Sequence, residues 1–395
     1  MYQKNLDRIS LTNTMIATVF FVLGFVVVGF FVEKSDWPTW IFYFAMIAIS
    51  YIAIFRFGKS NTNNRLFLII TWVCMLIPIG FRYMMAMDDA TYQYIFKQVS
   101  RMGFADLLTN GNEIGFLLVE KVISIVTQDY YISQIIYFMI AITILMIAIL
   151  KFKEILFLPI VFLGFYMILY FKFMSAGLNR MFFALTFVLL ALYSMYRINV
   201  KQYIIWVILA FLFHRSALIL LLFIPIFFQG FLGRAIGKLY SLMIPILTVV
   251  VAILFPYVAV FLSGRYVGYG NTSLSIHFSI TTIIQIVFLG VLLYLKKYIP
   301  EDATRDFYYK LLIISWFGFW VDLLLSSNAL GRIVYYCDLA TMLCVGVAYK
   351  YSLNNKIFFM FTSGYYYGIF CFTILFMQSN YDSLFPFLSL MEYLN

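Results

Sequence analysis

The chain is poor in charge, in cysteine and in histidine. Charged side chains make up 11% of its 395 residues, whereas a soluble domain carries about 25%. Hydrophobic residues make up 64% of the chain. A soluble fold could not bury that much apolar surface, so the composition excludes a soluble globular protein and predicts a polytopic membrane protein.

Motifs for cofactor binding and hydrolysis are also missing. The sequence has no phosphate-binding glycine loop, no HExxH helix, no Cys/His cluster and no nucleophile elbow. No group of acids has the spacing of a metal site, so we expect neither a metal nor a cofactor. We expect small core residues at the four cysteines, which lie in apolar stretches: Cys74, Cys337, Cys344 and Cys371.

What the chain has is a series of apolar runs, most of them near the ~20 residues that an α-helix needs to cross a bilayer. We predict an all-α integral membrane protein in which residues 1–395 form one polytopic domain with about 12–13 transmembrane segments. The first run lacks a small-residue cleavage site, which predicts a transmembrane helix rather than a cleaved signal. The runs lie near residues 12–32, 37–55, 66–81, 133–150, 155–171, 181–196, 202–213, 217–230, 239–262, 278–295, 311–325, 333–349 and 357–376.

The lysines and arginines predict the orientation. The N-terminal tail and the loops on its side of the membrane hold 17 of the 27. Because cytoplasmic loops are enriched in these residues, we predict a cytoplasmic N-terminus and an external C-terminus. A net charge of +10 is typical of proteins that bind anionic lipid headgroups or nucleic acid, and in a membrane protein we expect no nucleic-acid partner.

Some arginines nevertheless fall on the external side, where positive charge is disfavoured. Bidentate recognition of phosphate or carboxylate is one reason for an arginine there. The alternative is that each arginine caps a helix end or pairs with an external acid. The six are Arg82, Arg101, Arg180, Arg215, Arg265 and Arg332.

The longest external segment, residues 82–130, exceeds an ordinary connection between helices. Its stretch TYQYIFKQVSRMGFADLL has apolar residues at helical spacing, which predicts an amphipathic helix on the membrane surface. The segment carries six acids, Asp88, Asp89, Asp106, Glu113, Glu120 and Asp129.

The stretch FLFHRSALILL places His214, Arg215 and Ser216 inside an apolar run. The flanking runs, 202–213 and 217–230, are each too short to cross as α-helices. We therefore predict a pair of half-helices near residues 202–230 that meets at the outer face. The three polar residues would lie at the tip of this hairpin and line a polar cavity, where non-helical backbone finds partners.

Several short motifs form a pattern along the chain. They are Arg82, Asp88 and Tyr92 in FRYMMAMDDATYQY, Glu113 in NEIGF, His214 and Ser216 of an FHxSAL motif in LFHRSALI, and Arg332 and Tyr336 in GRIVYY. Through them the chain resembles the EpsG family of bacterial exopolysaccharide proteins, which is similar to the Wzy class of polysaccharide polymerases. The matches extend from residue 82 to residue 336, and FHxSAL is the most specific of them.

Two positions depart from the family pattern. The family usually has Gly, an aliphatic residue and Arg-Gln at a helix start, whereas AGLNRMFFAL has Asn179 at the Arg position and Arg180 one residue later. One residue rotates a side chain by about 100° around a helix. Arg180 can take the same role only if the backbone or its long side chain compensates. The proline of the acid-Pro-Gly-Phe motif is Ile114 here.

The resemblance implies a fold similar to the GT-C membrane glycosyltransferase superfamily and a location in the bacterial cytoplasmic (inner) membrane. It implies polymerisation of undecaprenyl-diphosphate-linked repeat units of an O-antigen, capsule or exopolysaccharide, by glycosyl transfer at the outer face. Beside these glycans and the lipid bilayer, a chain-length regulator is an expected partner. Two other classes stay open: a flippase for the same lipid-linked repeat, and a membrane acyltransferase that modifies the glycan.

This chemistry suggests roles for the matched residues. Arginines suit the charge that develops on a diphosphate leaving group, and the acceptor hydroxyl needs a base. The predicted catalytic residues are Asp88, Glu113 and His214, with the carboxylates favoured over the histidine as base. The predicted diphosphate ligands are Arg82, Arg180 and Arg332, and further substrate contacts are Arg215, Ser216, Tyr92 and Tyr336.

Each candidate base also has a structural interpretation. An aspartate at 88 or 89 would cap the helix that follows. Glu113 would pair with an external arginine, and His214 would bond to backbone at a helix break. Because a diphosphate leaves readily and no acid cluster suits a metal, we expect a metal-independent reaction.

Overall fold

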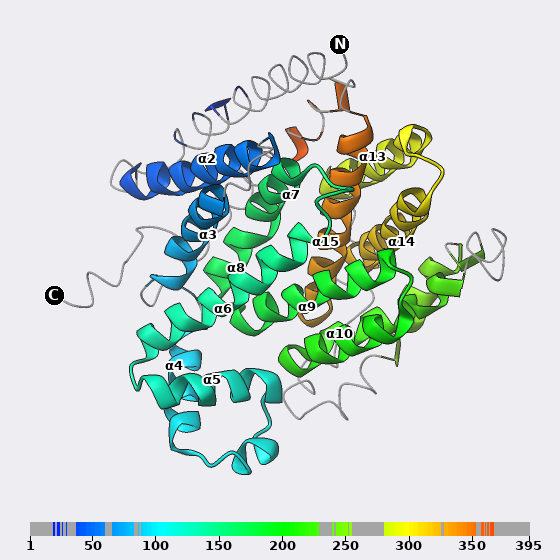
Figure 1. Ribbon diagram of the computed structural model, residues 1–395. Helices are drawn as coiled ribbons and strands as arrows, with labels where there is room; N and C mark the ends of the chain where they lie inside the picture. The colour runs from blue at the N-terminus through cyan, green and yellow to red at the C-terminus, as the bar shows by residue number, and fades with distance from the viewer. Residues whose placement is uncertain are drawn as a thin grey trace. The chain divides into compact units, whose positions relative to one another are not determined.

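The computed structural model describes residues 37–59, 65–82, 88–228, 242–251, 280–324 and 328–352, with single positions between and beyond these ranges. Every regular element in this described part is a helix (Figure 1), which confirms the predicted all-α membrane fold. Five helices are long and apolar enough to span a membrane: Trp37–Phe57, Tyr130–Leu150, Asn179–Tyr196, Ala303–Leu324 and Gly331–Tyr351. Most of the predicted first segment, 12–32, and most of 357–376 lie outside the described residues.

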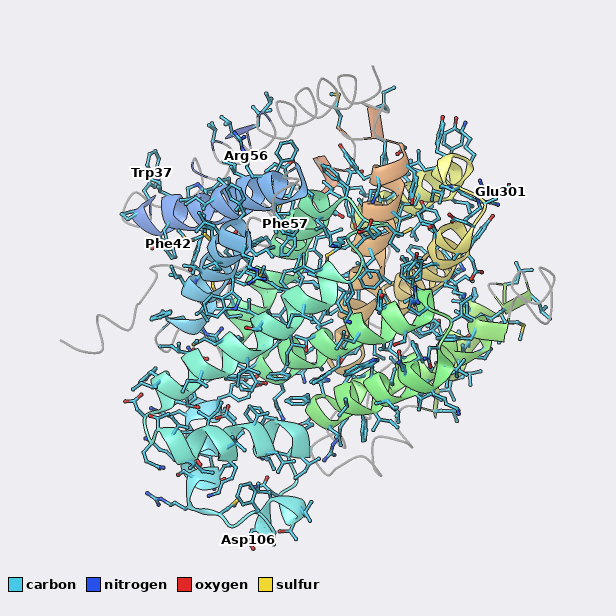
Figure 2. The ribbon with its side chains drawn as sticks, in the orientation of Figure 1. Trp37, Phe42, Arg56, Phe57, Asp106 and Glu301 are labelled. Atoms are coloured by element: carbon cyan, nitrogen blue, oxygen red, sulfur yellow. The ribbon has the colours of Figure 1, made fainter. Side chains whose placement is uncertain are left out.

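Helix boundaries follow the apolar runs because burial in hydrocarbon requires an unbroken apolar segment with every backbone group paired. α2 (Trp37–Lys59) begins where its run begins, and α3 (Arg65–Gly80) and α6 (Tyr130–Leu150) differ from theirs by a few residues. Exposed Trp37 lies in the first turn of α2 and exposed Arg56 in its last turn (Figure 2). Aromatic and basic residues at opposite ends are typical anchors of a membrane span.

The described chain divides into two compact units, each of which is described by itself. The first unit comprises Met1–Asn110, Phe116–Phe182 and Ser352–Asn395. In it α2 packs on α3 and on α7 (Leu158–Gly164), and α3 packs on α6. The chain continues from α7 through a π-helical stretch, η3 (Phe165–Tyr170), into α8 (Phe171–Ala176).

The long segment 82–130 contains more helix than we predicted. α4 (Asp89–Arg101) lies at the amphipathic stretch and packs on α6. A short 3-10 helix, η2 (Asp106–Thr109), follows, with Asp106 exposed (Figure 2). α5 (Ile114–Val126) was not predicted, because it is only 13 residues long and carries Glu120 and Lys121 at its centre.

The second unit comprises Gly111–Gly115 and Phe183–Tyr351. It contains most of α9 (Asn179–Tyr196), then α10 (Val200–Phe213), η4 (Arg215–Phe228), α13 (Ile280–Leu295), η5 (Lys296–Tyr298), α14 (Ala303–Leu324) and α15 (Asn328–Tyr351). α14 packs along α15, and η4 packs on both α10 and α15. Gly318 lets α14 approach α15 closely, because a Cβ there would overlap the Cβ of Cys337.

The predicted half-helix pair near residues 202–230 is present as a hairpin. α10 ends at Phe213, His214 is extended (φ −153°, ψ 115°), and η4 begins at Arg215. Tyr203 of α10 donates a hydrogen bond to Leu220 O (2.7 Å), and its ring packs on Phe227 with centroids 4.9 Å apart, so the two arms are antiparallel. Because η4 is a 3-10 helix, its rise of ~2.0 Å per residue exceeds the ~1.5 Å of an α-helix.

Candidate functional site

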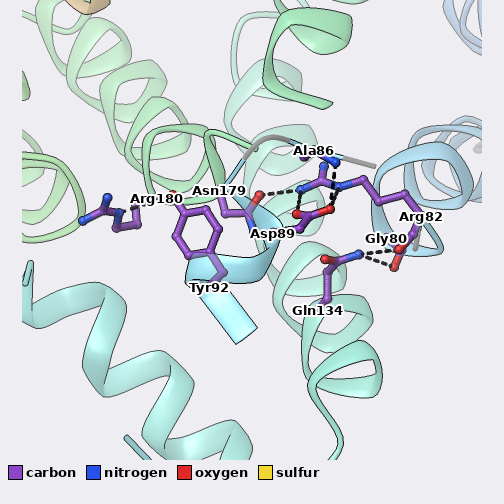
Figure 3. A network of polar contacts seen from close by, with 8 residues as sticks. All are labelled: Gly80, Arg82, Ala86, Asp89, Tyr92, Gln134, Asn179 and Arg180. Atoms are coloured by element: carbon purple, nitrogen blue, oxygen red, sulfur yellow. Dashed lines mark hydrogen bonds and ion pairs between the residues drawn. The ribbon is translucent and has the colours of Figure 1, made fainter. Parts of the chain in front are cut away.

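A buried arginine organises one polar network in the first unit. Arg82 follows α3 and is only 1% exposed. Its Nη2 and Nε donate to the two carboxylate oxygens of Asp89 at 2.9 and 3.3 Å, and Nη2 also donates to Asn179 Oδ1 at 2.9 Å (Figure 3). The Asp89 carboxylate also accepts from the Ala86 amide at 2.9 Å. The charge of Arg82 is therefore largely neutralised by Asp89.

The backbone around Arg82 is fixed as well. Gln134 of α6 donates to Gly80 O at 3.2 Å and to Arg82 O at 3.0 Å (Figure 3). The guanidinium carbon lies 5.5 Å from the centroid of the Phe138 ring. Of the guanidinium nitrogens of Arg82, Nη1 has no hydrogen-bond partner among the described residues. This leaves one nitrogen of the predicted diphosphate ligand for any substrate.

The two neighbouring aspartates, Asp88 and Asp89, differ in where their side chains lie. Asp88 is the N-cap of α4, but its side chain makes no capping bond, so the capping interpretation is wrong for this residue. Asp89 lies on the buried face of α4 with Tyr92, Phe96 and Val99. That helical spacing was visible in the sequence and could have identified Asp89 as the inward-facing acid.

Arg180 and Tyr92, two predicted substrate contacts, lie together. Arg180 Nε donates to the Tyr92 hydroxyl at 3.3 Å. Its guanidinium carbon lies 5.6 Å from the Tyr92 ring centroid and 5.9 Å from that of Phe116, within the range of cation–π attraction. Asn179, at the family's Arg position, instead joins Arg82, a contact that the sequence did not reveal.

A second polar cluster lies in the second unit and brings together three predicted residues. His214 Nδ1 lies 2.6 Å from Ser216 Oγ, and the Tyr336 hydroxyl lies 3.1 Å from that Oγ and 3.4 Å from Nδ1. His214 and Ser216 come from the hairpin tip and Tyr336 from α15. The imidazole thus contacts two hydroxyl groups, a finding that the helix-break interpretation of His214 did not anticipate.

Arg215 lies between His214 and Ser216 in the sequence but bonds to another segment. Its Nη2 donates to Gly111 O at 3.1 Å, which ties the segment 111–115 to the hairpin tip. A Cβ on Gly115 would lie 2.9 Å from Leu212 O, so this segment lies directly against the backbone of α10. Glu113 in the same segment is buried.

Arg332 lies one turn before Tyr336 on α15, at the start of the candidate span Gly331–Tyr351. It is half-buried and has no hydrogen-bond or ion-pair partner among the residues that the structure describes. An arginine inside a membrane is costly unless something compensates its charge. Its position therefore suits an anionic ligand.

Glu120 is a buried acid that the sequence did not mark as functional. It lies on α5, outside the candidate spans, and accepts a hydrogen bond from Ser133 Oγ at 3.0 Å. Burial raises the pKa of Glu120 from 4.5 to about 7, and the Ser133 bond opposes that shift. Within the described residues no group of three or more His, Cys, Asp or Glu could hold a metal ion.

The fold and these sites define a helical integral membrane protein with arginines and aromatic hydroxyl groups gathered in buried polar clusters. The model of the EpsG family matches residues 65–389, so the chain belongs to the EpsG family. This family is related to the Wzy-type polysaccharide polymerases, and membership gives the chain a role in polysaccharide biosynthesis. No curated protein and no solved structure matches the chain.

Proposed function

We propose that the chain polymerises oligosaccharide repeat units carried on undecaprenyl diphosphate, at the outer face of the bacterial cytoplasmic membrane. Family membership supports polysaccharide polymerisation in general. The observation that carries the specific proposal is Arg332, which has no partner among the described residues and lies one turn from the hydroxyl–imidazole cluster. A cation beside a proton acceptor is what transfer from a lipid diphosphate requires.

The reaction is a substitution at an anomeric carbon. An acceptor hydroxyl oxygen forms the new C–O bond, the bond from that carbon to the diphosphate oxygen breaks, and the lipid diphosphate leaves with the electron pair. Arg332 binds the diphosphate and stabilises its growing negative charge through charge-assisted hydrogen bonds. Arg180 and Tyr92 supply a further phosphate or glycan contact in the first unit.

The proton of the acceptor hydroxyl goes to His214 in this proposal. An imidazole exchanges protons near neutral pH, and the hydroxyls of Ser216 and Tyr336 both reach its Nδ1. These hydroxyls orient the ring and give the proton a path toward it. The mechanism uses no metal and no cofactor.

Arg332→Ala tests the proposal. A strain without the gene should retain glycan capped with a single repeat unit, and Arg332→Ala should lower polymer by about 100-fold, the typical loss of one group that stabilises developing charge. The variant protein should insert at the normal level. Arg101→Ala is the matched control, because Arg101 is an exposed external arginine in the predicted topology, and it should leave polymer unchanged.

The other functions give different glycans in the same assay. Loss of a flippase leaves almost no capped glycan, and loss of an acyltransferase leaves chains of full length. Long polymer in the deletion strain would contradict the polymerase assignment, and full polymer from Arg332→Ala would remove Arg332 from the site.

A further inference from the structure

The Arg82–Asp89 pair connects the neighbouring ends of α3 and α4 to the start of α9, which is distant in sequence. Arg82 follows α3, Asp89 begins α4, and Asn179 begins α9, 97 residues from Arg82. The loop before α4 is held to the turn before α9 by close contact. Gly177 there has φ +68°, and a Cβ on it would lie 3.0 Å from Ala86 Cβ and 3.1 Å from Asp88 Cβ.

The contacts of Arg82 are those of a structural group that links parts of the fold, rather than those of a ligand-binding group. Three hydrogen bonds connect it to Asp89 and Asn179 at distances of 2.9 to 3.3 Å. Its opposite charge, Asp89, is equally buried. A guanidinium with a bidentate carboxylate partner has little charge to offer a further anion.

The geometry points to Asp89 and Arg82 as positioning residues that set the direction of Arg180. Consecutive residues on a helix project about 100° apart. When Asn179 is held toward Arg82, Arg180 projects to another side of the helix, away from Arg82 (Figure 3). There its guanidinium lies near the rings of Tyr92 and Phe116. The shift from Arg-Gln to Asn179-Arg180 is thereby accommodated, because Asn179 supplies a neutral acceptor where a second buried cation would repel Arg82.

The ligand of Arg180 in this inference is a phosphate or glycan group of a lipid-linked substrate, so this part rests on the proposed function. The positioning of Arg180 by Asn179, Arg82 and Asp89 does not depend on the proposed function. Asp89 is a positioning residue, since it acts on Arg180 through Arg82 and Asn179.

The competing explanation is that the ion pair only stabilises the fold. Removing one partner of a buried pair leaves an uncompensated charge and is strongly destabilising, whereas replacing both partners by apolar residues is often neutral. The double variant R82M/D89L therefore keeps the fold but removes the donor to Asn179. Asn179→Ala removes the same contact and keeps the ion pair. Asp106→Asn is the matched control, because Asp106 is an exposed aspartate of the same unit.

The experiment measures amide hydrogen exchange in the first two turns of α9 on the purified full chain. We expect exchange about tenfold faster in R82M/D89L and in Asn179→Ala, because a hydrogen bond to a charged group is lost, and no change in Asp106→Asn. In polymer synthesis the same two variants should raise KM for the lipid-linked substrate about tenfold and leave kcat within about twofold.

Wild-type exchange in both R82M/D89L and Asn179→Ala would overturn the positioning role. Exchange does not depend on activity, so it decides the role of Asp89 even if Arg332→Ala contradicts the proposed function. Faster exchange with an unchanged KM would support the positioning of α9 by Arg82 and Asp89 but would remove Arg180 as a substrate contact.

Discussion

Glu120 illustrates what burial does to a single side chain. Its carboxyl group lies on α5 with Ser133 Oγ as its hydrogen-bond donor. Desolvation disfavours the ionised form, and the pKa of this carboxyl rises from 4.5 to about 7. Since the raised pKa belongs to the folded state, the folded chain binds a proton that the unfolded chain has already lost between these two values.

Replacing this acid changes how stability depends on pH. The stabilising contribution of protonated Glu120 is fully present below pH 4.5 and is lost as the pH rises through about 7. Glu120→Gln has no charge to bury and keeps an acceptor for Ser133. We expect it to have nearly the wild-type Tm at pH 4.5 and a higher Tm at pH 8, where the gain approaches roughly 3 kcal/mol. Thermal unfolding in detergent at both pH values measures this.

The control for Glu120→Gln is Glu154→Gln, because the side chain of Glu154 is 81% exposed. It should leave the Tm unchanged at both pH values. An equal shift for Glu120→Gln at pH 4.5 and pH 8 would show that ionisation of Glu120 has no part in stability.

At the scale of elements, the hairpin tip depends on the segment 111–115, which ends in the first turn of α5. Gly115 lies against the backbone of α10, where a Cβ would be 2.9 Å from Leu212 O. The same segment accepts the Arg215 hydrogen bond at Gly111 O. Neither helix can yield easily, because the close neighbour is a carbonyl group within α10 rather than the end of a flexible side chain.

Gly115→Ala should therefore displace this segment from α10. Overpacking of this kind costs about 1–3 kcal/mol, and the Arg215–Gly111 bond weakens with it. We expect a lower Tm and reduced polymer, measured on membranes with equal amounts of protein. Gly111→Ala is the control, since a Cβ at Gly111 meets nothing within 4 Å. Equal effects of the two substitutions would contradict the role of the close contact.

The sequence predicted some elements well and others not at all, for a physical reason. Apolar run length determines where a span begins and ends, so α2, α6 and α13 match their predicted runs within a few residues. α5 is too short and too charged to give that signal. The break at His214 was predictable because two short apolar arms flank a polar tripeptide.

The site was predictable only in part. Spacing along one helix relates Arg332 to Tyr336, and the FHxSAL motif places His214 beside Ser216. The bond from Arg82 to Asn179 crosses 97 residues, and no local pattern encodes such a pairing. The motif match favoured Asp88, whereas the buried face of α4 carries Asp89.

At the scale of the whole molecule, the predicted site residues divide between the two units. The first unit holds Arg82, Asp88, Tyr92 and Arg180, and the second holds Glu113, His214, Arg215, Ser216, Arg332 and Tyr336. Motif order along the chain does not reveal this division, because α5 and α9 each begin in one unit and continue in the other.

Chemistry at the outer face requires that the segments between the spans lie on the predicted sides of the membrane.

Orientation can be tested across a single span. α6 has 21 residues, enough for ~30 Å of hydrocarbon at ~1.5 Å per residue, and it separates Leu108 from Glu154. Both side chains are exposed, Leu108 at 77% and Glu154 at 81%. The positive-inside rule predicts that Leu108 lies outside and Glu154 in the cytoplasm.

A membrane-impermeant maleimide should label Leu108→Cys in intact cells and Glu154→Cys only after permeabilisation. The described native cysteines, Cys74, Cys337 and Cys344, are buried and react little, and Cys371 is replaced by serine in the parent chain. The reverse pattern would place the segment 82–130 in the cytoplasm, which is incompatible with polymerisation at the outer face. Labelling of both variants in intact cells would show that α6 does not cross the membrane.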